Sequence, residues 1–156
     1  MMGKSALVLG SSGLIGSLLL EKLFNHPDYA TIITIVRKPQ QINHPKLIEI
    51  VTDFNSEINL DDIETIDSIF SCLGTTRKKT PDLDVYRKIE VDIPNQFAKI
   101  GNQKGLTKFH YISAVGANAN SSNFYLKMKG EAEETLQKNT IKPVSYTHLT
   151  LPTILL

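Results

Sequence analysis

The sequence predicts an α/β fold of three layers, in which helices cover both faces of a doubly wound, open parallel sheet. The first observation is the apolar run at residues 6–9, because four apolar residues without a polar interruption are typical of a strand buried on both faces. The second is that such runs alternate along the chain with stretches whose apolar residues recur at helical spacing. With right-handed crossovers, this alternation predicts the strand order 3-2-1-4-5.

The composition predicts one globular domain and excludes several classes of partner. With 156 residues, 41% of them hydrophobic, the chain is long enough to bury a substantial core. A net charge of +1 gives no long-range attraction to nucleic acid or to a membrane, and no apolar run reaches the roughly 20 residues that span a bilayer. The basic run at residues 77–79 is short enough to be a solvated loop. The four histidines lie far apart, so we expect no metal site.

Cysteine content and the N-terminal residues predict the compartment. Cys72 is the single cysteine, so it has no partner for an internal disulfide. The chain also enters its first strand without a charged and then apolar leader. We therefore expect a cytosolic, that is cytoplasmic, protein.

Five strands are expected, each rich in apolar, β-branched or aromatic residues, at residues 6–9, 31–36, 47–51, 68–73 and 108–113. A first helix follows residues 10–13 and stops near Asn25, and a short helix is expected at residues 60–66. Because parallel strands end at the same edge of a sheet, a ligand is expected at the carboxyl ends of the first and fourth strands, where the strand order reverses.

Two further helices are expected in the second half of the chain. Residues 85–91 have a helical pattern, and Asp92 is expected to cap a following helix that carries Pro94 in its first turn. The last helix is expected to begin at Ser121 or Ser122 and to run to about Lys138. Its apolar residues recur every four positions and predict a buried stripe, namely Phe124, Met128, Ala132 and Leu136.

Glycines separate the first strand from the first helix. Gly10 permits a tight turn, Gly13 lets backbone N–H groups approach a pyrophosphate, and Gly16 lets the helix pack close to the strand. Glycines at loose spacing are also common in ordinary turns, and the spacing here is GxxGxxG rather than GxGxxG. Their position between a buried strand and an apolar helix favours dinucleotide binding.

A tyrosine and a lysine are the candidate chemical groups. Tyr125 and Lys129 are four residues apart, so both side chains project from one face of the last helix. A neighbouring ammonium lowers the pKa of a phenol, which favours proton exchange with a carbonyl or alcohol. Ser113, at the end of the fifth strand, is placed to donate to the substrate oxygen. The alternative is a surface Tyr and Lys on an amphipathic helix.

These residues together resemble the short-chain dehydrogenase/reductase superfamily, through GxxGxxG after the first strand, a serine ending the fifth strand, and YxxxK. Within it, residues 72–77, 121–124 and 125–131 resemble the atypical reductases related to the human Tat-interacting protein, over about residues 5–143. The resemblance implies a Rossmann-like fold. The chain departs from the members of this family at Ala114, where many of them have a second serine.

The resemblance also implies roles for individual residues. Tyr125 is then the proton donor and Lys129 its partner and a cofactor ligand, while Asp53 contacts the adenine. The remaining cofactor contacts come from the glycine turn, the end of the second strand and the end of the fourth strand, namely Gly10, Ser11, Ser12, Gly13, Leu14, Ile15, Gly16, Arg37, Lys38, Leu73, Gly74 and Thr75.

The cofactor is expected to be NADP(H) rather than NAD(H). An NAD site places Asp or Glu about 20 residues beyond the glycine turn, and Arg37 and Lys38 stand there instead. We expect hydride transfer to or from a small-molecule carbonyl or alcohol substrate. A non-catalytic NAD(P)-sensing regulator resembling the NmrA-like proteins is the alternative, and an interaction scaffold is the third.

The last residues carry a separate resemblance. Residues 144–153 resemble the translation of a transposon-end sequencing adapter, which predicts a dinucleotide-binding domain at residues 1–143, incomplete at its C-terminus, and a non-native tail at residues 144–156. The alternative is a genuine sixth strand, for which residues 147–151 have adequate β propensity. A short strand near residues 141–147 is also possible on an uncovered sheet edge.

Overall fold

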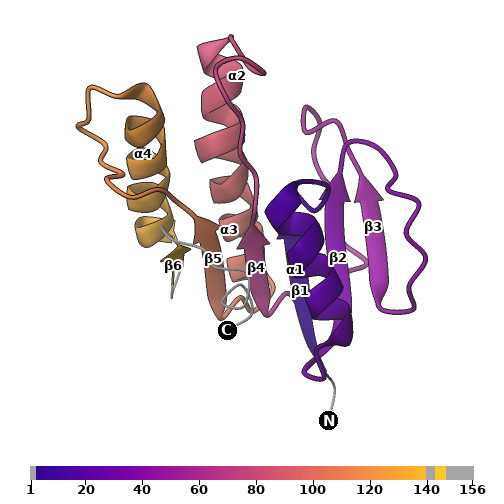
Figure 1. Ribbon diagram of the computed structural model, residues 1–156. Helices are drawn as coiled ribbons and strands as arrows, with labels where there is room; N and C mark the ends of the chain where they lie inside the picture. The colour runs from indigo at the N-terminus through magenta and orange to yellow at the C-terminus, as the bar shows by residue number, and fades with distance from the viewer. Residues whose placement is uncertain (1–2, 140–142, 147–156) are drawn as a thin grey trace.

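The computed structural model describes residues 3–139 and 143–146, which form a parallel sheet with helices on both faces (Figure 1). The strands are β1 (Lys4–Leu9), β2 (Tyr29–Val36), β3 (Leu47–Val51), β4 (Ser68–Ser71), β5 (Lys108–Ile112) and β6 (Pro143–Tyr146). All of their pairings are parallel, and their order is β3-β2-β1-β4-β5-β6. The expected order 3-2-1-4-5 is confirmed, with β6 added beside β5.

Alternate residues of β1 face opposite layers, as the period of two requires. Leu7 and Leu9 belong to the larger apolar cluster, under α3 (Ile93–Gln103) and α4 (Phe124–Asn139). Ala6 and Val8 belong to the smaller cluster, under α1 (Leu14–Asn25). The uninterrupted apolar run thus reflects burial on both faces, and all four side chains are fully buried.

The helices divide between the two faces of the sheet. Figure 1 shows α1 lying across β1 and β2, and α3 and α4 side by side over the other half of the sheet. The expected stripe on α4 is buried at Met128, Ala132 and Leu136, while Phe124 is half-buried against the same cluster. These helices place the carboxyl ends of β1, β4 and β5 at one edge of the molecule.

The short helix expected at residues 60–66 does not form. Asn59 accepts a hydrogen bond from the Asp61 backbone N–H at 2.8 Å, and the Ile63 N–H bonds to the Leu60 carbonyl at 2.9 Å. This local turn competes with a helix, as Asn and Asp side chains commonly do. The segment is irregular, and its apolar side chains still enter the core at Ile58, Leu60, Ile63 and Ile66.

Two expected helix caps are also wrong. Asp82 caps α2 (Leu83–Arg87) by accepting from two backbone N–H groups, and the helical backbone then continues through a π-helical turn, η1 (Lys88–Asp92), into α3. Asp92 therefore lies inside a helix and makes no capping hydrogen bond. On α4, Asn123 accepts from the Leu126 N–H at 3.2 Å, which is the bond that a cap makes to the third helical residue.

The end of the chain is only partly described. β6 pairs with β5 from Pro143 beside Phe109 to Tyr146 beside Ile112, so a short strand does occupy this edge. The alternative of a genuine sixth strand at residues 147–151 lies outside the described residues. The boundary at residue 143 and the non-native character of the tail stay predictions.

Candidate active site

The glycine turn brings β1, β4 and α1 into close contact. Gly10 has a φ of +75°, and a β-carbon there would lie 2.7 Å from the carbonyl oxygen of Cys72. A β-carbon on Gly16 would collide with the carbonyl oxygen of Gly10. Both positions therefore require glycine, one for its left-handed backbone and one for helix packing.

Gly13 differs from these two glycines because no protein atom crowds it. The nearest atom to a β-carbon built at Gly13 is the Gly10 carbonyl oxygen, at 3.5 Å. Gly13 is also the N-cap of α1 and provides no side-chain capping bond, and Leu14 in the first turn is 79% exposed. The backbone N–H groups of this turn, including that of Ile15, are suited to an anion.

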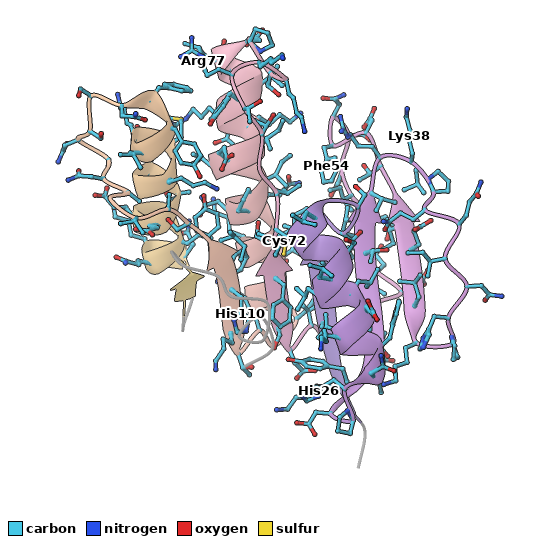
Figure 2. All side chains as sticks on the ribbon, in the orientation of Figure 1. His26, Lys38, Phe54, Cys72, Arg77 and His110 are labelled. Carbon is cyan, nitrogen blue, oxygen red and sulfur yellow. The ribbon has the colours of Figure 1, made fainter. Side chains whose placement is uncertain are left out.

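A cavity of about 650 Å³ opens beside this turn. Six of its lining residues are among those predicted to contact the cofactor, namely Gly10, Ser11, Ser12, Arg37, Lys38 and Leu73. Figure 2 shows Lys38 and Phe54 at the same upper edge of the sheet, on the β2–β3 side of Cys72. The cavity thus lies at the carboxyl ends of the strands, where the topology predicts a ligand.

Two residues of this cavity were missed by the sequence reasoning. Gln40 accepts a 2.7 Å hydrogen bond from the fully buried Ser11 hydroxyl, so it ties the glycine turn to the segment after β2. Phe54 lines the cavity with a φ of 61°, an unusual conformation for a bulky residue. No spacing rule indicates either residue, because each reaches the cavity through a loop conformation.

Asp53, expected at the adenine, is not among the cavity-lining residues. It is exposed, and its carboxylate accepts from the Asn55 backbone N–H at 2.9 Å and from the Ser56 hydroxyl at 3.4 Å. The Asn55 N–H lowers the pKa of this carboxyl. Asp53 therefore shapes the turn that presents Phe54 to the cavity.

The basic residues after β2 are free to meet a ligand. Arg37 and Lys38 are both exposed at the cavity, and neither forms an ion pair with any residue in the described part of the chain. No carboxylate follows β2 directly, because Arg37 and Lys38 are followed by Pro39 and Gln40. A guanidinium in this position matches a phosphate better than it matches a ribose hydroxyl.

The structure brings Tyr125 and Lys129 together on α4. The Lys129 Nζ lies 5.8 Å from the centre of the Tyr125 ring, and it donates a 3.1 Å hydrogen bond to the Ile112 carbonyl oxygen at the end of β5. Tyr125 is 43% exposed, whereas Lys129 is 4% exposed. The phenol thus borders solvent while its neighbouring ammonium is held inside the protein.

The charge of Lys129 is balanced by a residue that sequence reasoning missed. Glu90, in η1, places Oε2 2.8 Å from the Lys129 Nζ, and both side chains are buried. Burial and the Glu90 charge raise the pKa of Tyr125. The expectation that Lys129 lowers this pKa is therefore wrong, because burial, and after it the Glu90 carboxylate, disfavour the tyrosinate.

Ser113 follows β5 directly and is buried. Its hydroxyl has no hydrogen-bond partner within the described residues, so it retains a donor for a ligand. Gly74 and Thr75 follow β4, and the Thr75 N–H donates to Glu90 Oε1 at 3.1 Å. The ends of β4 and β5 are thus linked to α4 through Glu90.

Other kinds of site find no support in the part of the chain that the structure describes. Residues 3–139 contain no group of three or more His, Cys, Asp or Glu side chains arranged to hold a metal ion. The described helices include none that is long and apolar enough to cross a membrane.

The parallel sheet, the glycine turn and the Tyr125–Lys129 pair define an atypical member of the short-chain dehydrogenase/reductase class. The family described as the NAD dependent epimerase/dehydratase family matches residues 6–151, and the chain belongs to this family. The resemblance inferred from the sequence is thereby confirmed at the level of the superfamily.

Curated relatives come from fungi. The chain is 33% identical over 135 residues to "Protein FMP52-1, mitochondrial" of Scheffersomyces stipitis, covering 85% of this chain and 60% of that protein. It is 34% identical over 136 residues to "Protein fmp52-1, mitochondrial" of Aspergillus terreus, covering 83% and 59%. The chain thus spans about three fifths of the length of these relatives. Their names contradict the expected cytoplasmic location, which was inferred from the N-terminal residues and cysteine content.

Solved structures share the fold. "MoeE5 in complex with UDP-glucose and NAD" matches with a TM-score of 0.72 at 21% identity, covering 92% of this chain and 53% of that one. A short-chain dehydrogenase/reductase superfamily protein from Agrobacterium tumefaciens with bound NAD matches with a TM-score of 0.75 at 15% identity, covering 92% and 48%. At these identities the likeness shows a Rossmann-like fold.

Proposed function

We propose that the protein is an NADP-dependent oxidoreductase that acts on a small-molecule carbonyl or alcohol. The observation that carries the proposal is that both groups of residues lie at the carboxyl ends of the strands: the glycine turn and basic cavity at β1 and β2, and the Tyr125–Lys129 pair at the end of β5, where Lys129 bonds to the Ile112 carbonyl. Tyr125, Lys129 and Ser113 do not themselves line the cavity. The fungal relatives support a mitochondrial location, which we propose for this protein as well.

The residues around the cavity suit a dinucleotide with a 2′-phosphate. The uncrowded Gly13 and the start of α1 provide N–H groups for the pyrophosphate. Arg37 and Lys38 carry two positive charges at the position where an NAD site has a carboxylate. A 2′-phosphate adds negative charge at this position, so NADP(H) is favoured over NAD(H).

The cofactor, when bound, supplies or accepts the hydride, and the protein supplies the proton and the geometry. Tyr125 keeps its phenolic proton, because burial and Glu90 raise its pKa, so it is a proton donor to a carbonyl oxygen rather than a base. Ser113 donates its unpartnered hydroxyl to the same oxygen. Lys129, which donates one hydrogen bond to the Ile112 carbonyl, offers a further N–H to the cofactor ribose.

A non-catalytic NAD(P)-sensing regulator is the second candidate. One observation favours it: the ammonium of Lys129 is paired with Glu90, and burial and Glu90 raise the pKa of Tyr125 rather than lower it. Such a protein binds the cofactor at the same cavity and turns over no substrate.

Isotope transfer separates the two functions. Full-length protein is incubated with NADPH deuterated at the reactive position and a panel of aldehydes and ketones, and the products are analysed by mass spectrometry. An oxidoreductase incorporates deuterium at the carbonyl carbon. Tight binding of NADPH without deuterium in any product supports the regulator instead.

A further inference from the structure

The interior of the helical layer contains a carboxylate to which the proposed chemistry assigns no contact with substrate or cofactor. Glu90 is 1% exposed, and it lies in η1, a π-helical turn between α2 and α3. π-Helical turns are rare and occur frequently at functional sites. A carboxylate buried this deeply is costly unless other groups satisfy it.

The π-helical turn fixes the backbone of Glu90. The Ile93 N–H bonds to the Lys88 carbonyl five residues earlier, and Pro94 has no N–H with which to bond the Glu90 carbonyl. The buried Tyr111 hydroxyl of β5 donates to that carbonyl instead, at 3.5 Å. Glu90 is therefore attached to the sheet as well as to its own helix.

Each carboxylate oxygen of Glu90 contacts a different part of the site. Oε1 accepts from the Thr75 N–H at 3.1 Å, in the loop that follows β4. Oε2 lies 2.8 Å from the Lys129 Nζ on α4. Lys129 also donates a hydrogen bond to the Ile112 carbonyl, so its ammonium is held between Glu90 and the end of β5. The contact with Glu90 is an ion pair, and Oε2 accepts no hydrogen bond within the described residues.

The groups facing this ion pair come from four parts of the fold. The ring of Tyr111 lies 5.1 Å from the Lys129 Nζ. Burial, and after it the Glu90 charge, raises the pKa of Tyr86, Tyr111 and Tyr125. Glu133 also raises that of Tyr111, and Arg77 lowers that of Tyr86. Glu90 is the one group whose negative charge acts on all three phenols.

We propose that Glu90 is a positioning residue of the site, one that holds the Lys129 ammonium against β5 beside the Tyr125 ring and ties it to the loop at Thr75. The use of this arrangement in catalysis rests on the proposed function. The charge relationship among Glu90, Lys129 and Tyr125 does not, so it is measurable without any turnover.

The test is the titration of Tyr125 by NMR in the present chain labelled with ¹³C at the tyrosine ring carbon bonded to oxygen. The Tyr125 signal is assigned by its loss in Tyr125→Phe. Glu90→Gln keeps the size of the side chain and removes its charge, and Glu134→Gln, at an exposed position of α4, is the matched control. Glu90→Asp restores a carboxylate.

In Glu90→Gln the Tyr125 midpoint is expected to fall by about one pH unit or more, because a repelling carboxylate is lost and the Lys129 charge is unbalanced. Glu134→Gln and Glu90→Asp are expected to keep the midpoint near that of the parent. An unchanged midpoint in a folded Glu90→Gln overturns the proposal. A shifted midpoint without deuterium transfer from NADPH leaves it standing and refutes the proposed function.

A second comparison tests the proposed role of Glu90 if Glu90→Gln does not fold. Lys129→Met and the double variant Glu90→Gln/Lys129→Met are compared for NADPH affinity by fluorescence, and the double variant leaves no unpaired buried charge. Equal affinities are expected, because Glu90 acts through Lys129. A further loss of fivefold or more in the double variant, relative to Lys129→Met (on the order of 1 kcal/mol), overturns the proposal.

Discussion

The carbonyl oxygen of Gly10 occupies the space that a β-carbon on Gly16 would need, so the first turn of α1 rests directly on the end of β1. This contact sets the position of the helix N-terminus relative to the strand. It connects a sequence pattern, GxxGxxG, with the opening of the cavity.

Gly16→Ala is expected to destabilise the fold by about 1–3 kcal/mol, the usual effect of overpacking, because backbone rather than a flexible side chain must move. Urea denaturation measures the change. Gly13→Ala is the matched control, since its β-carbon meets no atom closer than 3.5 Å. Equal stability of Gly16→Ala and the parent would contradict the close packing described here.

Arg37→Ala is expected to weaken NADP⁺ binding by about tenfold or more and to leave NAD⁺ binding nearly unchanged, because a hydrogen-bonded charge contributes roughly 1.5–3 kcal/mol. Isothermal titration calorimetry measures both affinities. Lys22→Ala, in the last turn of α1, is the control for loss of a surface charge. If the parent binds both cofactors equally, the assignment of Arg37 is wrong.

The thiol of Cys72 is expected to react slowly with iodoacetamide at pH 8. Burial raises its pKa to about 12, so nearly all of it remains the unreactive thiol at that pH. Cys72 is the single cysteine, which makes mass spectrometry of the intact chain a direct assay. Alkylation of the folded chain as fast as in guanidinium chloride would show that the end of β4 is open.

Carbonyl reduction is expected to keep a constant kcat from neutral pH to about pH 9. Burial and Glu90 raise the pKa of Tyr125 above the ordinary phenol value of about 10, so the proton donor is lost only at higher pH. The reverse oxidation needs the tyrosinate and should accelerate as pH rises. A loss of reduction already near pH 7 would indicate a lowered pKa.

The strand order was predictable because each strand carries its own signal. Residues 6–9 and 31–36 are buried on both faces, and their apolar or β-branched character is independent of what packs on them. The prediction of a helix at residues 60–66 was wrong because the Asp61 N–H donates to the Asn59 side chain, and this bond changes the backbone there. Apolar residues at similar spacing are compatible with a helix and with an irregular segment.

The site residues that belong to a motif of fixed spacing were predictable from the sequence. The residues that join the site through a contact distant in sequence were not. The separation of Tyr125 and Lys129 is a property of one helix. Glu90 lies 39 positions before Lys129 in the sequence and contacts it from a π-helical turn. No local sequence pattern predicts this turn. The direction of the Tyr125 pKa shift was predicted wrongly because the spacing of the motif indicates neither the burial of the phenol nor the Glu90 charge.

The proposed role of Tyr125 is to donate a proton at an NADPH site, and the kcat of Tyr125→Phe in the full-length protein tests this role. With a carbonyl substrate that the parent reduces, this variant is expected to lose about 10²–10⁴-fold in kcat while binding NADPH as tightly as the parent. Tyr29→Phe, at the start of β2, is the control and should retain full turnover. Full turnover in a folded Tyr125→Phe would contradict the account.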